Sequence, residues 1–360
     1  MRLKFFKTGA LLIFFGCRIS IAQDIHFSHE EYAPLILNPA LAGADYETQF
    51  TNNNRTQWNS VQAPYKTLNA SFDNRLGHII KGTSGYFATG INMFYDRSGD
   101  SKMSTASVMA SFASHVFLNK HNTFGTALYF GLGQRSFSEG NLQWANQYDG
   151  TYFQSSSPTG ENFEAHQFMY PDVGAGVVYT FLSGGKYFTP RDKIRINAGG
   201  ALFHVNKPKY SFNTDSDERL FIRYTAFVNG LFQIQNSLFT IVPGAYLNFQ
   251  GPAKEILFGS YIKYYLLKDN TQDASQNKTS TIGLGIFHRL DEAFILKALY
   301  EWEDFSAGVS YDLNIRQLSH YSGRRDGFEI FLRYVHNKEQ DKHLPRQSIC
   351  PSMPVTENKK

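Results

Sequence analysis

Cysteine is almost absent from this sequence, which has two cysteines, Cys17 and Cys350, in 360 residues. The first lies within residues 1–22, where a basic start, a short apolar run and small residues before a cut site are typical of a secretory signal peptide. Cleavage there makes Gln23 the first residue of the mature chain and removes Cys17. One remaining cysteine forms no disulfide within the chain, so we expect the fold to hold without one.

The alternative for Cys17 is a lipoprotein anchor. Phe14, Phe15 and Gly16 before it and Arg18 after it fit a lipidation signal poorly. We therefore predict a cleaved signal peptide and a mature chain without a lipid.

Long hydrophobic runs are also missing after the leader, since no stretch approaches the roughly 18 apolar residues that a transmembrane helix needs. Strong charge of one sign is missing too: the formal net charge is +4 and the basic residues are scattered, which argues against nucleic acid as a partner. Aromatic residues and glycine are abundant, with 32 Phe, 21 Tyr and 29 Gly. This composition is typical of a transmembrane β-barrel; an array of soluble β-sandwiches is the alternative.

Apolar residues alternate with small or polar ones along residues 47–336. Phe124, Leu128 and Phe130, for example, share one face of a stretch whose other face carries Ala127 and Tyr129. Counting such runs predicts about fourteen strands, near 47–57, 66–75, 86–96, 103–117, 122–137, 172–182, 193–204, 221–234, 237–249, 255–267, 279–289, 294–301, 304–314 and 326–336. The sequence thus predicts an all-β fold: a single antiparallel barrel of the outer membrane, followed by a polar tail at residues 337–360.

The alternation also predicts which side chains face lipid. In the last strand these are Phe328, Ile330, Leu332 and Tyr334. Charged residues on the opposite faces either line a conducting pore or pair with one another inside a plugged lumen, and the plugged lumen is favoured because a barrel of this size holds a plug. These inward-facing residues are Arg195, Arg289, Lys297, Glu301, Glu329 and Arg333.

Residues 23–46 interrupt the alternation. Pro34 and Pro39 remove two backbone donors that a strand needs, and Pro39 would sit inside any ordinary helix. A compact apolar segment with fixed turns is typical of a plug or of an ordered lead-in on the periplasmic side.

Three phrases near the start resemble the mature N-terminus of the PorP/SprF family, outer-membrane proteins of the type IX secretion system. A closing hairpin is similar as well, with Tyr311-Asp312-Leu313-Asn314 ending one strand and Gly327-Phe328-Glu329-Ile330 in the next. The resemblance therefore covers both ends of the mature chain, and Thr56 is a small departure, because the family commonly has Asn there. The three phrases are Gln23-Asp24-Ile25-His26-Phe27-Ser28, Asn38-Pro39-Ala40-Leu41-Ala42-Gly43 and Arg55-Thr56-Gln57-Trp58.

The resemblance implies a non-catalytic role in type IX secretion, in some cases related to gliding, with no cofactor. It implies three kinds of partner: outer-membrane lipid, periplasmic type IX secretion components, and a large exported surface protein or adhesin with a C-terminal secretion domain. Core machinery and a dedicated adhesin partner both remain open. A transport channel, porin-like or for lipids and hydrophobic compounds, is the alternative from another class.

An even number of strands places both termini in the periplasm, so the connections after odd-numbered strands are extracellular. These include residues 138–171, 206–219 and 316–325. The first is the longest, and it contains more aromatic residues than a disordered polar loop. Trp144, Tyr148 and Tyr152 are therefore candidates for binding a protein partner, with a membrane-interface belt as the alternative.

Enzymatic interpretations have little support. His26 and His29 with Glu30 and Glu31 have the chemistry of metal ligands, but no further ligand pattern accompanies them. Scattered Ser, His and Asp residues do not establish a hydrolase triad, which is recognised by geometry. We expect no catalytic and no metal-binding residue.

Overall fold

The structure is a computed structural model of the full chain. The signal peptide, Gln23, both cysteines and the polar tail lie outside the residues that it describes. The described residues are 24–58, 64–77, 84–99, 101–138, 142–160, 165–183, 194–213, 215–234, 237–266, 280–315 and 325–336.

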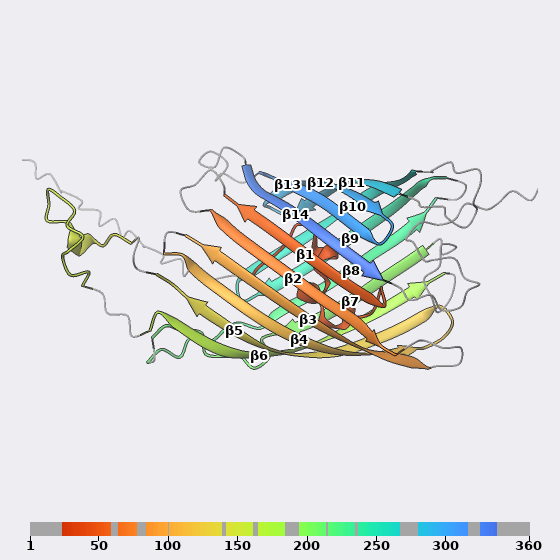
Figure 1. Ribbon diagram of the computed structural model, residues 1–360, viewed down its shortest axis with the longest axis horizontal. Helices are drawn as coiled ribbons and strands as arrows, with labels where there is room; N and C mark the ends of the chain where they lie inside the picture. The colour runs from red at the N-terminus through yellow and green to blue at the C-terminus, as the bar shows by residue number, and fades with distance from the viewer. Residues whose placement is uncertain are drawn as a thin grey trace, which may run out of the picture.

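The described residues form fourteen antiparallel strands in one closed barrel (Figure 1). Each strand pairs with its neighbours in the sequence, and β1 pairs with β14 to close the ring. The predicted fold class and strand number are confirmed. The strands are β1 (Thr48–Gln57), β2 (Tyr65–Leu76), β3 (Gly85–Ser98), β4 (Met103–Phe117), β5 (Asn122–Ser136), β6 (Gln167–Leu182), β7 (Ile194–Phe203), β8 (Arg223–Gln233), β9 (Phe239–Gln250), β10 (Ala253–Leu266), β11 (Ser280–Arg289), β12 (Ala293–Trp302), β13 (Phe305–Asn314) and β14 (Arg325–His336).

The alternation sorts side chains between the outside and the lumen, as the period of two in a strand requires. On β14, Phe328 and Ile330 are about half exposed on the outside, whereas Glu329 and Phe331 are buried inside. The outward face of β14 is therefore apolar, as a bilayer requires. Leu332 is also exposed and Tyr334 is half-buried on the same outer face.

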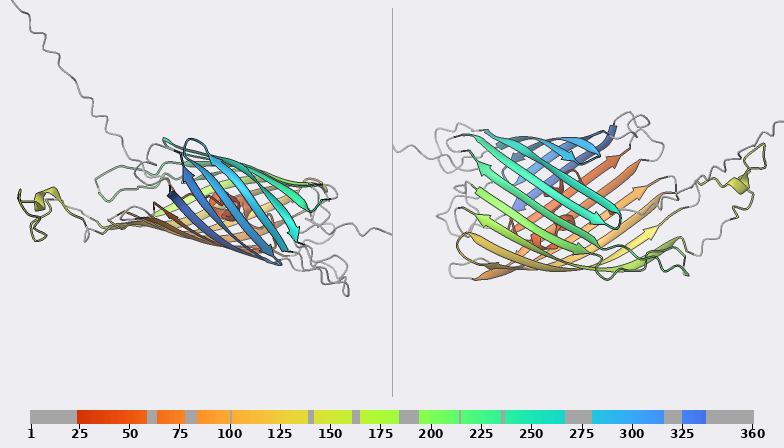
Figure 2. Two further views of the ribbon diagram at one scale, coloured as in Figure 1. Left: turned by 90° about the horizontal axis from the view of Figure 1, so that it is seen from above. Right: turned by 180° about the vertical axis from the view of Figure 1, so that it is seen from behind.

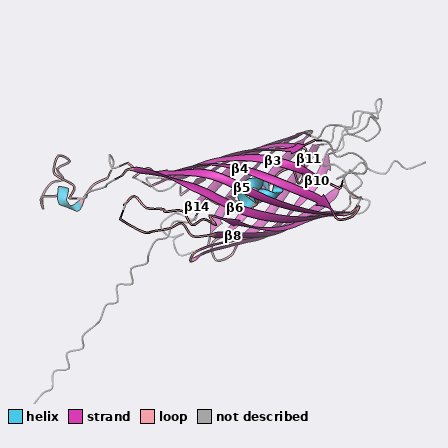
Figure 3. Ribbon diagram, turned by 90° about the horizontal axis from the view of Figure 1, so that it is seen from below, coloured by secondary structure: helices cyan, strands magenta, loops and turns pink. Residues whose placement is uncertain are grey.

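Residues 24–46, which we call the luminal segment, lie inside the ring of strands (Figure 2, red; Figure 3, cyan helices). The segment makes three short helical turns: η1 (Glu30–Tyr32), α1 (Pro34–Leu37) and η2 (Pro39–Leu41). Each proline stands in the first turn of its helix, where a missing N–H breaks no hydrogen bond. Among the described residues no helix is long and apolar enough to cross a bilayer.

The luminal segment runs from one mouth of the barrel to the other. Asp24 contacts His204, directly after β7, whereas Gly43 contacts Asp73, close to the end of β2. We call the mouth at which the odd-numbered strands end the odd mouth, and the mouth at which the even-numbered strands end the even mouth. Asp24 therefore lies at the odd mouth and Gly43 at the even mouth. The described chain thus starts at the odd mouth and finishes, at His336, at the even mouth. The prediction put both termini on one side, because strand parity takes no account of a segment threaded through the lumen.

A lysine on the lipid-facing side of β14 should impair assembly. Ile330→Lys places a charge on the outer wall, which costs roughly 2–4 kcal/mol near the bilayer midplane, whereas Ile330→Leu leaves the surface apolar. The fraction of heat-modifiable barrel in outer membranes measures the effect. Equal assembly of the two variants would show that this side of β14 does not face lipid.

Candidate functional site

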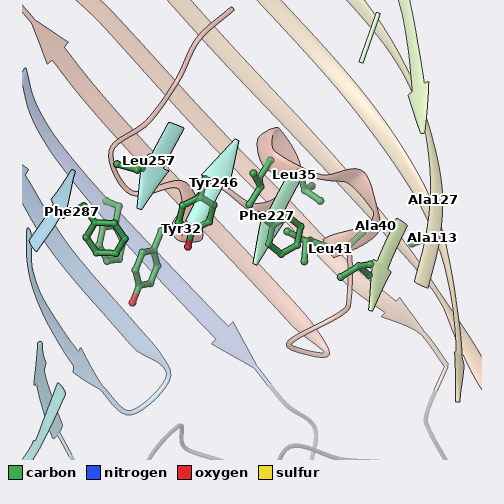
Figure 4. Close-up of a cluster of buried hydrophobic side chains, with 14 of the residues drawn as sticks. Tyr32, Leu35, Ala40, Leu41, Ala113, Ala127, Phe227, Tyr246, Leu257 and Phe287 are labelled. Carbon is green, nitrogen blue, oxygen red and sulfur yellow. The ribbon is translucent and has the colours of Figure 1, made fainter. Parts of the chain in front are cut away.

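The luminal segment presents a largely apolar surface to the inner wall. Tyr32, Leu35 and Leu37 are at most 3% exposed. They belong to one cluster with side chains of the surrounding strands, including Phe227 and Tyr246 (Figure 4). Burying an apolar side chain of this size stabilises a fold by about 1.5–3 kcal/mol, so packing of this surface alone favours a segment held inside the barrel.

Ser28 is the centre of a buried polar cluster. The backbone N–H groups of Ser28 and His29 donate to the Glu329 carboxylate, at 2.6 and 3.1 Å. The Ser28 hydroxyl donates to Asp312, at 2.8 Å, and accepts a hydrogen bond from Arg55. Arg55 in turn forms an ion pair with Asp312, at 2.7 Å.

Arg289 completes this cluster from β11. Its guanidinium pairs with Asp312 at 3.0 Å and with Glu255 at 2.8 Å, and it donates to the Ser28 hydroxyl at 3.2 Å. Buried charges are tolerated when they are paired and hydrogen-bonded in this way. We call Ser28, Arg55, Glu255, Arg289, Asp312 and Glu329 the seam cluster.

The seam cluster joins the sequence phrases that the family resemblance singled out. Ser28 ends the first phrase, Arg55 begins the third, and Asp312 and Glu329 belong to the closing hairpin. Arg55 on β1 and Glu329 on β14 are direct partners in the register of the two strands that close the ring. One cluster therefore holds the luminal segment and bridges the seam of the barrel.

A second anchor surrounds Tyr32. Its hydroxyl donates to Glu301 at 3.3 Å, and its ring stacks on Phe331 with centroids 3.8 Å apart. Glu301 also pairs with Lys263, at 3.0 Å, and with Arg333, whose guanidinium lies 4.6 Å from the centroid of the Tyr32 ring. The predicted inward-facing charges are thus engaged with one another and with the luminal segment.

The two glutamates of η1 have different partners. The Glu31 carboxylate lies 3.2 Å from the Lys297 ammonium. The Glu30 carboxyl accepts a hydrogen bond from the side-chain amide of Asn248, at 3.3 Å.

Asn38 fixes the middle of the luminal segment. Its side-chain nitrogen donates to the carbonyls of Val177 and Gly200, at 2.9 and 3.1 Å, and its side-chain oxygen accepts from the Ala40 N–H. A Cβ at Gly176 would lie 2.1 Å from that oxygen. Only glycine in β6 therefore lets Asn38 come so close to the wall.

Gly43 turns the chain out of the lumen with a positive φ of 64°. Its N–H donates to Asp73 at 2.9 Å, and its carbonyl accepts from Arg75 at 2.6 Å and from the Tyr86 hydroxyl at 3.1 Å. A Cβ here would lie 2.5 Å from that of Ala88, so both conformation and space require glycine.

Asp24 holds the other end at the odd mouth. Its carboxylate lies 2.6 Å from Nε2 of His204, and Nδ1 of that ring lies 2.9 Å from Asp172. Burial disfavours a charge on His204, but the two carboxylates outweigh it and raise its pKa to about 9. His204 is thus a cation at neutral pH, clamped between two anions.

The remaining residues of the family phrases have structural contacts. Phe27 is fully buried in a second apolar cluster. Gln57 lies 3.4 Å from the ring nitrogen of His26, and the Trp58 ring packs edge-on against Tyr65 at 4.9 Å. Pro39 and Ala40 are buried in η2.

The candidate docking residues lie in residues 142–160, which we call the tip. A 3-10 turn, η3 (Ala145–Gln147), and a bridge between Tyr148 and Phe153 give it internal order. The buried Gln147 side chain donates to two backbone carbonyls, and Asp149 accepts from two backbone N–H groups. In Figures 1 and 2 the tip stands beyond the ends of β5 and β6.

The three predicted aromatics differ in exposure. Tyr148 and Tyr152 are 56% and 72% exposed, whereas Trp144 is half-buried. Near the strand ends, Phe168 packs against Tyr210 and Phe212 of the next odd-mouth loop, with centroids 5.5 and 4.9 Å apart. The two loops are therefore joined at their base, which the sequence did not reveal because it shows no contact between separate loops.

No group of three or more His, Cys, Asp or Glu side chains in the described part of the chain is arranged to hold a metal ion. His29 instead contacts the Tyr261 hydroxyl at 2.9 Å and Glu31 at 3.5 Å.

Comparison with known proteins identifies a family. The family model described as "Type IX secretion system membrane protein PorP/SprF" matches residues 19–334. Comparison with curated proteins gives no match.

Comparison with solved structures finds similar chains at low sequence identity. The Ralstonia pickettii toluene transporter TbuX is 11% identical, with a TM-score of 0.45 over 84% of this chain and 93% of that chain. A deltaS2 mutant of the TodX monoaromatic hydrocarbon channel is 9% identical, with a TM-score of 0.44 over 86% and 94%. The Acinetobacter baumannii outer membrane protein Omp33 is 6% identical, with a TM-score of 0.37 over 82% and 100%.

Neutralising Glu329 should destabilise the barrel. Glu329→Gln leaves Arg55 with one fewer buried counter-charge, and breaking such a pair costs about 3–5 kcal/mol. The matched control is Asp304→Asn, the same chemical change in an exposed turn, which should cost less than about 0.5 kcal/mol. The two variants are compared by their midpoints of urea unfolding in lipid vesicles. Equal midpoints would mean that the seam cluster contributes no stability.

His204 should make stability depend on pH. Because its pKa rises from 6.5 to about 9 on folding, the stabilisation is complete below pH 6.5 and is lost as the pH rises through 9. His204→Gln should therefore lower the urea midpoint at pH 6 and have little effect at pH 10. A difference between the two proteins that is constant across this range would contradict the ion-pair clamp.

Proposed function

Because the chain belongs to the PorP/SprF family of type IX secretion system membrane proteins, we propose that it is a non-catalytic outer-membrane component that binds an exported surface protein. Periplasmic secretion machinery is its second partner. Family membership points to a non-enzymatic role in secretion. The observation that carries the rest is a lumen occupied along its length by residues 24–46, which leaves the ends of the barrel as binding surfaces.

A transport channel fits these contacts less well. The inward-facing charges that would line a pore are paired: Lys263 and Arg333 with Glu301, and Lys297 with Glu31. An aqueous path would require these pairs to exchange partners and the apolar cluster around Tyr32 to separate. The packing of the luminal segment against the inner wall supports a role in holding proteins at the membrane.

The tip is the proposed docking surface for the exported protein. Binding energy in protein interfaces concentrates in Trp and Tyr side chains, and Tyr148 and Tyr152 project from a segment with its own hydrogen bonds. A preordered surface loses less conformational entropy on binding than a flexible loop. Trp144, half-buried in the same tip, is the third member.

The odd mouth is the proposed extracellular side. The two longest connections between strands, after β5 and after β7, both lie at the odd mouth, and outer-membrane barrels keep their long loops outside. In this orientation Asp24 is at the cell surface and His336 is periplasmic, where the following residues meet the secretion machinery.

Removing the two exposed rings should abolish docking without harming the barrel. Tyr148→Ser combined with Tyr152→Ser should reduce surface display of the exported partner roughly 30-fold, the effect of losing about 2 kcal/mol at an interface hot spot. Thr151→Ala in the same tip should leave display unchanged. Immunolabelling of intact cells measures display, and normal display by the double variant would exclude the tip as the docking surface.

The orientation has its own test. An epitope inserted directly after Gln23 should be labelled by antibody on intact cells, whereas the same epitope directly after His336 should be labelled only after permeabilisation. Heat-modifiability of both proteins verifies that each barrel has folded. The opposite labelling pattern would show that the barrel has the inverse orientation, with the odd mouth in the periplasm.

A further inference from the structure

The outward face of β1 is polar. Its inward side chains, such as Thr51 and Asn53, are fully buried in the lumen. The alternate positions face outward, with Asn54 exposed and Asn52 partly exposed. From one mouth to the other the outward residues are Thr48, Phe50, Asn52, Asn54 and Thr56.

The strands on either side of β1 are apolar at the same level. Asn54 stands between Ile330 of β14 and Leu68 of β2, which are 48% and 45% exposed. Asn52 stands between Leu332 and Ala70. Both asparagines lie at the centre of their strand, and within the described strands no other central outward position carries an amide or a charge.

The side-chain amides of Asn52 and Asn54 have donors and acceptors that are not used within the described part of the chain. Asn52 donates once, to the Asn69 carbonyl at 3.1 Å, and the Asn54 side chain makes no hydrogen bond within the described part of the chain. An amide offers two donors and a carbonyl acceptor. In hydrocarbon an unsatisfied polar group costs several kcal/mol, so a lipid-covered surface is unfavourable here.

We propose that the outward face of β1 is the contact surface for a second copy of this chain. Two barrels side by side in one membrane share a twofold axis along the membrane normal, because both insert with the same orientation. Rotation about such an axis leaves each residue at the same depth in the bilayer in both copies. Asn52 and Asn54 of one copy therefore face Asn52 and Asn54 of the other.

Asparagine suits this symmetric contact. A twofold interface is self-complementary, and an amide pairs with an identical amide by donating and accepting in turn. Hydrogen bonds between polar side chains and close approach at small residues both hold membrane proteins together. Ala70 and Thr56 flank the asparagines and allow that approach, while Ile330 and Leu68 supply apolar packing at the rim.

Cysteine cross-linking in outer membranes tests the contact. In a Cys350→Ser background, Asn54→Cys should form a disulfide-linked pair of twice the chain mass on mild oxidation. The control is Val228→Cys, which is 47% exposed on the outside of β8, seven strands away from β1 around the ring in either direction. Val228→Cys should remain unlinked.

A second measurement uses leucine, which the bilayer tolerates. Asn52→Leu combined with Asn54→Leu should still give a heat-modifiable barrel but weaken dimerisation in detergent roughly tenfold or more, because the amide hydrogen bonds between the two copies are lost. Three results would overturn the proposal: no linked pair from Asn54→Cys, equal linking of Val228→Cys, or a linked product of another mass. The last would assign the face to a different membrane protein.

Discussion

The pairing of Arg55 with Asp312 and Glu329 is the constraint on which the rest of this structure depends. It joins β1 to β13 and β14 across the seam of the ring, and it places both carboxylates where Ser28 and His29 donate to them. The same side chains therefore contribute to closure of the barrel and to retention of the luminal segment. Because each charge is buried, loss of any member leaves an uncompensated partner, which is far more costly than loss of a surface ion pair.

Periodicity was sufficient to predict the wall from the sequence. Every strand was placed to within a few residues, apart from β6, which begins at Gln167 rather than near 172. Alternation also put Arg333 and Glu301 in the lumen, but it contains no information on which charges meet, since their contacts join residues up to hundreds of positions apart. For residues 24–46 the prolines exclude a strand and favour a plug or a lead-in, yet they do not say which path the segment takes, and so its course from the odd mouth to the even mouth could not be predicted.

The two faces of β1 separate two tasks. Arg55 and its inward neighbours hold the luminal segment, whereas Asn52 and Asn54 point toward the membrane from the same ten residues. The occupied lumen, the ordered tip at the odd mouth and the polar outward face of β1 are the features on which the proposed role in protein binding rests. Solute transport would require the contacts between the luminal segment and the inner wall to open, and the side chains that make them, such as Arg55, Glu329 and Phe331, are almost fully buried.

The conductance of single barrels in planar bilayers tests the sealed lumen most directly. The intact protein should show no stable open channel, and deletion of residues 24–46 should produce large, long-lived current steps from a barrel that is still heat-modifiable. Steady porin-like conductance from the intact protein would contradict the account, since it would show that the luminal segment leaves an open path beside it.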